Sequence, residues 1–201
     1  MNPLKRQFIF TLLLLPLSFG LWYAAGALFA GPAAWLLDQL FALWLNPWVE
    51  GTALDGTTLV VTTAWGQANG EILPASQAGN QLVFEVNTRL VSYGIAFYAA
   101  LLGASADDRG FIHFGVGLTL LWVFMTLGLA AMVLKDFMLN IGAPFLTLAE
   151  APPATAIALI YQFSVLLAPT LLPVAIWAFQ LRGSPLWDEL ASGVRAATGR
   201  G

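Results

Sequence analysis

The chain of 201 residues is 59% hydrophobic and only 9% charged, with a formal net charge of -3. An ordinary soluble domain carries roughly 25% charged residues, so this composition indicates an integral membrane protein. The lack of cysteine excludes a disulfide, a thiolate nucleophile and a cysteine-ligated metal, and the lack of a basic cluster argues against a nucleic-acid partner.

The first apolar segment follows Lys5 and Arg6 and runs from residue 8 to residue 30 without a charged side chain. It exceeds the roughly 20 residues that a helix needs to cross about 30 Å of hydrocarbon. A cleavable signal peptide is the alternative, because a basic start followed by a leucine run is typical of one. We expect residues 1–30 to form a cytoplasmic N-terminus and a first membrane span, which Pro16 should kink.

Residues 31–50 form a second segment, in which Gly31-Pro32 is expected to interrupt the helix before it resumes. Asp38 lies in the middle of this segment, and three tryptophans lie near it. An aspartate is costly in hydrocarbon and tryptophans concentrate at the level of the lipid headgroups, so we expect a helix that lies on the membrane surface. A helical hairpin that crosses back through the membrane is the alternative.

Residues 51–89 are the only long polar stretch of the chain and predict a small β module. Residues 57–64 are dense in β-branched side chains, and residues 81–87 alternate between apolar and polar side chains, which is typical of strands. Asn69-Gly70 is a turn signal, and a short third strand is expected at residues 71–73.

The apolar side chains of this module need a cover, because a sheet of so few strands is marginal alone in water. The helix expected within residues 31–50 is one candidate for the cover, and an external partner is the other. Unpaired strand edges also invite strand addition. We expect the module to dock on a partner through exposed apolar side chains, which are Leu59, Val61, Leu82, Phe84 and Val86.

Three further apolar segments follow the module and predict three more spans. The first of them is short for a bilayer crossing. The next has no charged residue from 111 to 134, apart from the titratable His113, before Lys135 closes it. Pro169 and Pro173 predict a bend or break near the middle of the last. The expected order is a span at 90–104, a turn with Asp107 and Asp108 at 105–110, a span at 111–135, a loop at 136–153, a span at 154–181 and a tail at 182–201.

The distribution of lysine and arginine predicts the orientation, because short cytoplasmic segments are enriched in these residues. With a cytoplasmic N-terminus and four spans, only Arg89 and Lys135 lie outside. The β module is then extracytoplasmic, both termini are cytoplasmic, and the membrane is the inner membrane of a bacterium. If residues 31–50 crossed the bilayer, the module would be cytoplasmic and the charge distribution poorer. The basic residues expected inside are Lys5, Arg6, Arg109, Arg182, Arg195 and Arg200.

His113 is the one histidine of the chain. Ionisable groups in membrane spans are often functional, which makes His113 a candidate proton carrier. An interfacial histidine that is hydrogen-bonded to the preceding turn is the preferred interpretation. The sequence contains no Ser-His-Asp constellation, metalloprotease motif or phosphate-binding loop, so no catalytic residue, cofactor or metal is expected.

The stretch from Asn87 to Leu102 carries a family resemblance. Its residues Asn-Thr-Arg-Leu-Val-Ser-Tyr-Gly-Ile-Ala-Phe-Tyr-Ala-Ala-Leu-Leu resemble the corresponding region of exosortase H-associated membrane proteins. The resemblance in overall plan covers nearly the whole chain. It implies an accessory role beside an exosortase, a polytopic membrane cysteine transpeptidase that processes C-terminal sorting signals. The resemblance transfers no catalytic residue, because this chain lacks cysteine.

The resulting hypothesis is a mainly α-helical integral membrane protein that is a non-catalytic accessory subunit of a protein-sorting or envelope export system. Its β module would contact an exosortase-type enzyme or the client of that enzyme. A small transporter or channel component is the alternative, and an enzyme acting on lipid or peptide comes third. The candidate interaction residues are Phe84, Glu85, Asn87, Arg89, Tyr93 and Gly94.

Overall fold

The computed structural model describes residues 3–105, 109–184, 186–189 and 191–192. Asp107 and Asp108 of the expected turn, and Arg195 and Arg200 of the expected tail, lie outside the described residues. The chain divides into two compact units. The first unit comprises residues 1–24, 93–121 and 170–201, and the second comprises residues 25–92 and 122–169.

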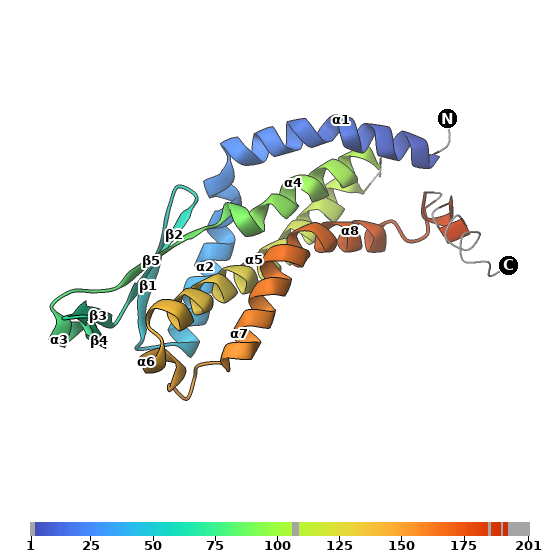
Figure 1. Ribbon diagram of the computed structural model, residues 1–201. Coiled ribbons are helices and arrows are strands. Elements are labelled where there is room, and N and C mark those ends of the chain that lie inside the picture. Colours follow the sequence, from blue (N-terminus) through green and yellow to red (C-terminus); the bar gives the residue numbers. More distant parts are fainter. Residues whose placement is uncertain (1–2, 106–108, 185, 190, 193–201) are drawn as a thin grey trace. The chain divides into compact units, whose positions relative to one another are not determined.

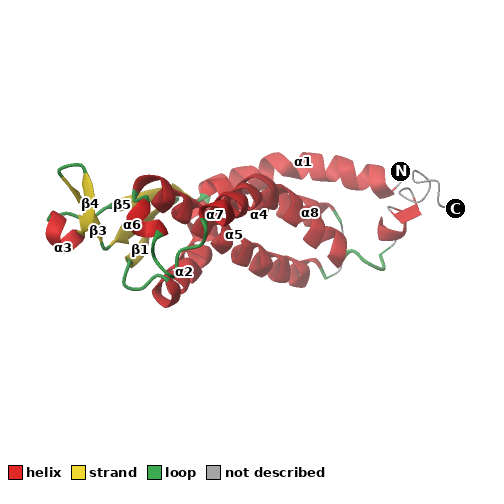
Figure 2. Ribbon diagram, turned by 60° about the horizontal axis from the view of Figure 1, so that its bottom comes forward, coloured by secondary structure: helices red, strands yellow, loops and turns green. Residues whose placement is uncertain are grey.

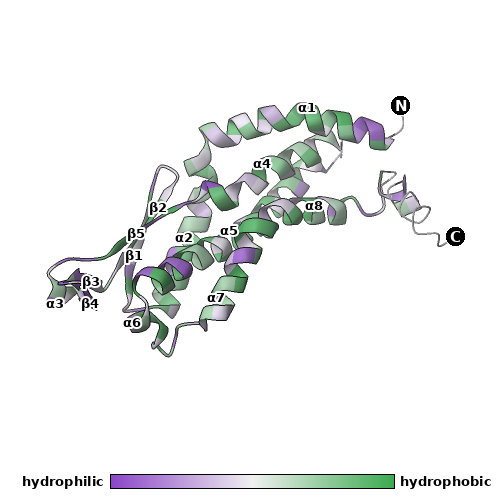
Figure 3. Ribbon diagram, viewed as in Figure 1, coloured by the Kyte–Doolittle hydropathy of each residue, from purple (hydrophilic) through white to green (hydrophobic). Residues whose placement is uncertain are grey.

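The described residues contain four helices that are long and apolar enough to cross a membrane. Figure 3 shows that hydrophobic residues dominate these helices, whereas the start of the first helix is hydrophilic. The prediction of a mainly helical membrane fold with a small sheet is confirmed. The four helical segments are Pro3–Ala24, Gly26–Trp44, Gly110–Asn140 and Ala154–Gln180.

The first unit consists of α1 (Pro3–Ala24) and parts of α4 (Arg89–Ala104), α5 (Gly110–Asn140) and α8 (Ala168–Gln180). The buried Gln7 amide joins α1 to α4 by donating to the Leu101 carbonyl at 2.9 Å. Most of α1 nevertheless stays exposed and carries large apolar side chains, so its surface suits contact with lipid.

Helix α2 (Gly26–Trp44) shows that the expected interruption at Gly31-Pro32 is wrong, because Pro32 lies inside the helix. Proline cannot donate the backbone hydrogen bond of its turn. Two side chains of α5 supply donors to carbonyls beside it, from Trp122 Nε1 to the Phe29 oxygen at 2.9 Å and from Thr126 Oγ1 to the Ala33 oxygen at 3.3 Å. Proline is thus tolerated inside α2, and the bonds from Trp122 and Thr126 tie this part of the helix to α5.

The four long apolar helices differ from the four spans expected from the sequence. Helix α4 has 16 residues, or about 24 Å of helix, and is shorter than the hydrocarbon thickness of about 30 Å. Helix α2 meets the length and composition criterion in its place. Its expected position on the membrane surface stays a prediction.

The last long helical segment consists of α7 (Ala154–Tyr161), η1 (Gln162–Leu167) and α8, in that order. Pro169 and Pro173 were expected to bend or break it. The segment is not broken, because helix continues past Pro173, but it has a π-helical turn that ends two residues before Pro169, and the bend stays a prediction. A π-helical turn absorbs an irregular hydrogen-bond pattern without ending the helix.

All strands lie in the second unit (Figure 2). An antiparallel sheet has the order β1-β2-β5, and β3 and β4 form a separate hairpin. Asn69 (φ 53°) and Gly70 (φ 83°) form the turn of that hairpin in the left-handed region, as the Asn-Gly signal predicts. The strands are β1 (Val49–Asp55), β2 (Thr58–Thr63), β3 (Trp65–Ala68), β4 (Glu71–Pro74) and β5 (Val83–Asn87), and the short helices are α3 (Ala75–Ala78) and α6 (Ala143–Leu146).

Strands β2, β4 and β5 coincide with the three expected strands, whereas β1 and β3 are additional. The sheet packs against α2 through β1 (Figure 1). Leu59, Val61 and Val86 are almost completely buried on its inner face. Of the two covers left open by the sequence, the internal one is therefore present at these positions, because α2 and α5 of the same unit pack against the sheet, and the expectation that Leu59, Val61 and Val86 are exposed for docking is wrong.

Candidate functional site

An aromatic cluster fixes the β module to the end of α5 and to α6. Phe137 is fully buried, and its ring packs edge-on against Phe84 at 5.1 Å, Phe145 at 5.5 Å and Trp65 at 6.1 Å between centroids. Trp65 also stacks on Trp48 at 5.1 Å. Edge-to-face and stacked aromatic pairs contribute about 0.5–1.5 kcal/mol beyond their burial. Sequence analysis did not identify Phe137 and Phe145 as partners of the module.

Asp38 of α2 provides a second anchor for the module. Its Oδ1 accepts hydrogen bonds from the Thr52 backbone nitrogen at 3.0 Å and from Thr52 Oγ1 at 3.1 Å. These bonds satisfy the carboxylate in the middle of an otherwise apolar helix. A charged carboxylate in an apolar helix is costly in free energy unless it is hydrogen-bonded. The sequence position of Asp38 therefore carried a signal that its side chain needs a partner.

The β1–β2 hairpin accompanies α2 along most of the length of the helix. Thr52 meets Asp38 in the second half of the helix, and Thr57 lies against Gly26 at its start. A Cβ atom at Gly26 would lie only 2.8 Å from the Thr57 methyl group, so this close approach requires a glycine. Helix α2 and the sheet therefore form one packed body.

The outward side of β5 offers an accessible row of side chains. Val83 is 50% exposed, and Glu85 and Asn87 are also exposed, whereas Phe84 and Val86 point inward. In the sheet formed by the described strands, β5 has a neighbouring strand on one side only. Asn87 also has a local role, because its Oδ1 accepts a hydrogen bond from the Arg89 backbone nitrogen at 3.0 Å.

The six candidate interaction residues therefore divide into different environments. Glu85 and Asn87 share the outward side of β5, and the half-buried Phe84 belongs to the aromatic cluster. Arg89 is half-buried at the start of α4. In the first unit, the Tyr93 hydroxyl lies 3.0 Å from Thr170 Oγ1, and Gly94 is buried. Val83, which sequence analysis did not select, completes the outward row.

His113 lies in the first unit with a half-buried side chain. Its backbone oxygen accepts a hydrogen bond from Gln180 Nε2 at 2.9 Å and lies 2.6 Å from the hydroxyl of the fully buried Tyr98. That hydroxyl is also 2.7 Å from Gln180 Oε1. The main chain rather than the imidazole makes these bonds, and the proton-carrier role of His113 stays a prediction.

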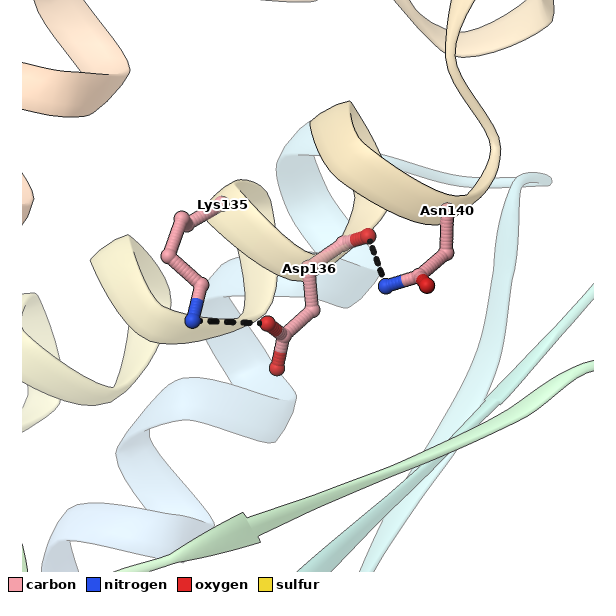
Figure 4. Close-up of polar contacts among 3 residues, drawn as sticks. All are labelled: Lys135, Asp136 and Asn140. Carbon is pink, nitrogen blue, oxygen red and sulfur yellow. Dashed lines mark hydrogen bonds and ion pairs between the residues drawn. The ribbon is translucent and has the colours of Figure 1, made fainter.

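Lys135 and Asp136 form an ion pair on α5, with Nζ and Oδ1 2.9 Å apart (Figure 4). The ammonium group also lies 4.9 Å from the centroid of the Tyr161 ring on α7. Asn140 Nδ2 donates to the Asp136 carbonyl at 2.8 Å. Helix α5 ends at Asn140, five residues beyond the expected end of the span at residue 135. Opposite charges and a cation–π contact satisfy these groups within the second unit.

The described residues contain no group of three or more histidine, cysteine, aspartate or glutamate side chains that could hold a metal ion. The features that stand out are the anchored β module and the outward row on β5. Such an arrangement presents a preformed surface, because the helices of the unit already fix the strands that carry it.

Comparison with known protein families identifies one match. The family model described as exosortase H-associated membrane protein matches residues 1–184, which confirms the resemblance noted for residues 87–102 and for the overall plan of the chain. No curated protein and no solved structure matches the chain significantly.

Proposed function

This chain belongs to the exosortase H-associated membrane proteins, and on that premise we propose that it is a non-catalytic accessory subunit that docks on an exosortase-type membrane enzyme. The contact surface is the outward side of β5, with Val83 at its start and Glu85 at its centre. The observation that carries this proposal is the exposure of this row on a strand whose inner side is already filled.

The edge position of β5 supports docking in a defined geometry. An edge strand has backbone donors and acceptors that a strand of a partner can pair with, and alternate side chains then give the contact its specificity. Val83 supplies apolar area, and Glu85 supplies a charge that selects a partner with a basic residue at the matching position. The aromatic cluster and the Asp38 anchor hold the strand in place before binding, which lowers the entropy that binding loses.

The packing of the β1–β2 hairpin on α2 supports a position of both outside the hydrocarbon of the bilayer. Open sheet edges are not found in contact with lipid tails, because their backbone groups would have no partner there. The β1–β2 hairpin lies beside α2 from Asp38 to Gly26, so a crossing α2 would draw the hairpin into the bilayer. We therefore place α2 at the membrane surface and the module on the extracytoplasmic side of the inner membrane, with both termini cytoplasmic, as the basic residues favour.

Co-purification from membranes tests the docking surface. The full chain carries an affinity tag and is co-expressed with the exosortase of the same genome. Val83→Asp and Glu85→Lys should each reduce the recovered enzyme at least tenfold while the level of the chain stays unchanged, because both side chains point away from the core of the module. Asp55→Lys makes the same kind of charge reversal in the β1–β2 hairpin and should retain the enzyme.

Unchanged recovery of the enzyme with Val83→Asp and Glu85→Lys would contradict the proposed surface. Equal losses with all three variants would show that a general charge effect, rather than a contact on β5, controls the association. Recovery of a client protein with a C-terminal sorting signal in place of the enzyme would assign the surface to the client and overturn the enzyme as partner.

A further inference from the structure

A groove in the first unit lies between the first turns of α5 and the last turns of α8. Its volume is about 560 Å³, within the range of small-molecule sites. Arg109, His113 and Gln180 line one end. Apolar side chains line the rest, and they include Val116 and Leu120 of α5 and Ile176 of α8. The groove is therefore polar at one end and apolar along its length.

The sequence order on the two helices places the polar groups at corresponding ends. His113, Val116 and Leu120 recur at intervals of three or four residues and share one face of α5, and Arg109, directly before the helix, continues this spacing. The polar residues come first on α5, and Gln180 comes last on α8. Leu120 lies about 16 Å along the helix axis from Arg109 at 1.5 Å per residue. The polarity therefore changes along the helix axes.

The polar end is organised by contacts that fix the Gln180 amide. Gln180 Nε2 donates to the His113 carbonyl at 2.9 Å, and its Oε1 lies 2.7 Å from the Tyr98 hydroxyl. The Gln180 amide nitrogen carries a second N–H, a guanidinium carries five N–H groups, and an imidazole carries at least one. These donors suit an anion with several oxygen atoms, and arginine binds phosphate through parallel hydrogen bonds.

We propose that this groove binds a membrane phospholipid, with the headgroup phosphate at Arg109, His113 and Gln180 and an acyl chain along Val116, Leu120 and Ile176. The positive charge of Arg109 favours the negatively charged phosphate. The apolar side chains beyond it favour a lipid over free phosphate, because an acyl chain can cover them whereas a free phosphate cannot. Val116 and Phe179 are strongly exposed, so the groove opens to the outside of the helix pair, where lipid surrounds a membrane protein. The site is separate from the docking surface on β5 and does not depend on it.

Native mass spectrometry of the full chain in mild detergent tests the site with phosphatidylglycerol as the probe. The unmodified chain should retain one phosphatidylglycerol after the other lipids have been removed. Arg109→Gln should weaken retention about tenfold. Ala175→Trp should weaken it to a similar extent, because Ala175 lines the groove and an indole would fill it while the charge stays. Arg6→Gln removes the same charge from an exposed position on α1 and should retain the lipid.

Equal retention by the unmodified chain and all three variants would overturn the proposal, because it would show only general contact with surrounding lipid. Equal loss with Arg109→Gln and Arg6→Gln would overturn it as a general charge effect. Displacement of the lipid by millimolar inorganic phosphate, with Ala175→Trp still binding that phosphate, would assign the site to free phosphate. Thermal unfolding midpoints of the variants check their folding, and if Ala175→Trp unfolds, the comparison of Arg109→Gln with Arg6→Gln decides.

Discussion

Phe137 should be the most sensitive residue for the attachment of the β module to the helices. Truncation of a buried phenylalanine to alanine typically costs about 3–5 kcal/mol. Phe137 is fully buried and makes three aromatic contacts, with Phe84, Phe145 and Trp65, so we expect Phe137→Ala to lower the free energy of opening of the module by about 4 kcal/mol. By the tenfold change per 1.4 kcal/mol, this corresponds to opening that is about a thousandfold more frequent.

Hydrogen exchange in detergent measures this opening strand by strand. In Phe137→Ala, amides of β3 and β5 should exchange up to about a thousandfold faster, while amides of α1 should keep their protection. Phe163→Ala is the matched control, because it removes the same ring from a half-exposed position in η1 of the same unit. If the amides of β3 and β5 exchanged equally slowly in Phe137→Ala and Phe163→Ala, the aromatic cluster would not hold the module, and the reasoning would be refuted.

Two further predictions concern the anchor and the orientation of the module. Asp38→Ala should destabilise β1 by about 1–3 kcal/mol, because Thr52 loses its acceptor, and hydrogen exchange of β1 should accelerate, whereas Asp55→Ala at an exposed site should not change it. Faster exchange in both variants, or in neither, would contradict the anchor. Alkaline phosphatase fused after Gln67 should be active and fused after Gly183 inactive, since the enzyme folds only outside the cytoplasm. The reverse pattern would contradict the proposed topology.

Local sequence patterns predicted much of the architecture, because they depend on neighbours along the chain. Uncharged apolar runs, β-branched density at residues 57–64 and the Asn69-Gly70 turn all act locally, and they appear in the structure as helices, β2 and a hairpin. Strand β1 has no such pattern. It contains Gly51 at an irregularity in its register, and its pairing with β2 defines it.

Features that depend on distant residues could not be predicted from the sequence alone. Gly31-Pro32 predicted an interruption, but α2 is continuous there and is tied to α5 by Trp122 and Thr126, which follow Pro32 by more than 85 residues. The cover of the module likewise depends on Phe137 and Phe145, whose packing against Phe84 and Trp65 leaves no local signal. The candidate site was predicted as one set of residues around β5, but side-chain direction within the strand separates Glu85 from Phe84.

Site-specific photo-crosslinking tests the docking of β5 most directly. A photoreactive amino acid replaces Val83 on the outward side of β5 or, as the control, the exposed Ala53 on β1 of the same sheet. In cells that contain both proteins, position 83 should yield a covalent adduct with the exosortase-type enzyme, and position 53 should yield none. An adduct at position 53 with none at position 83 would contradict the account, as would the absence of an enzyme adduct at both positions.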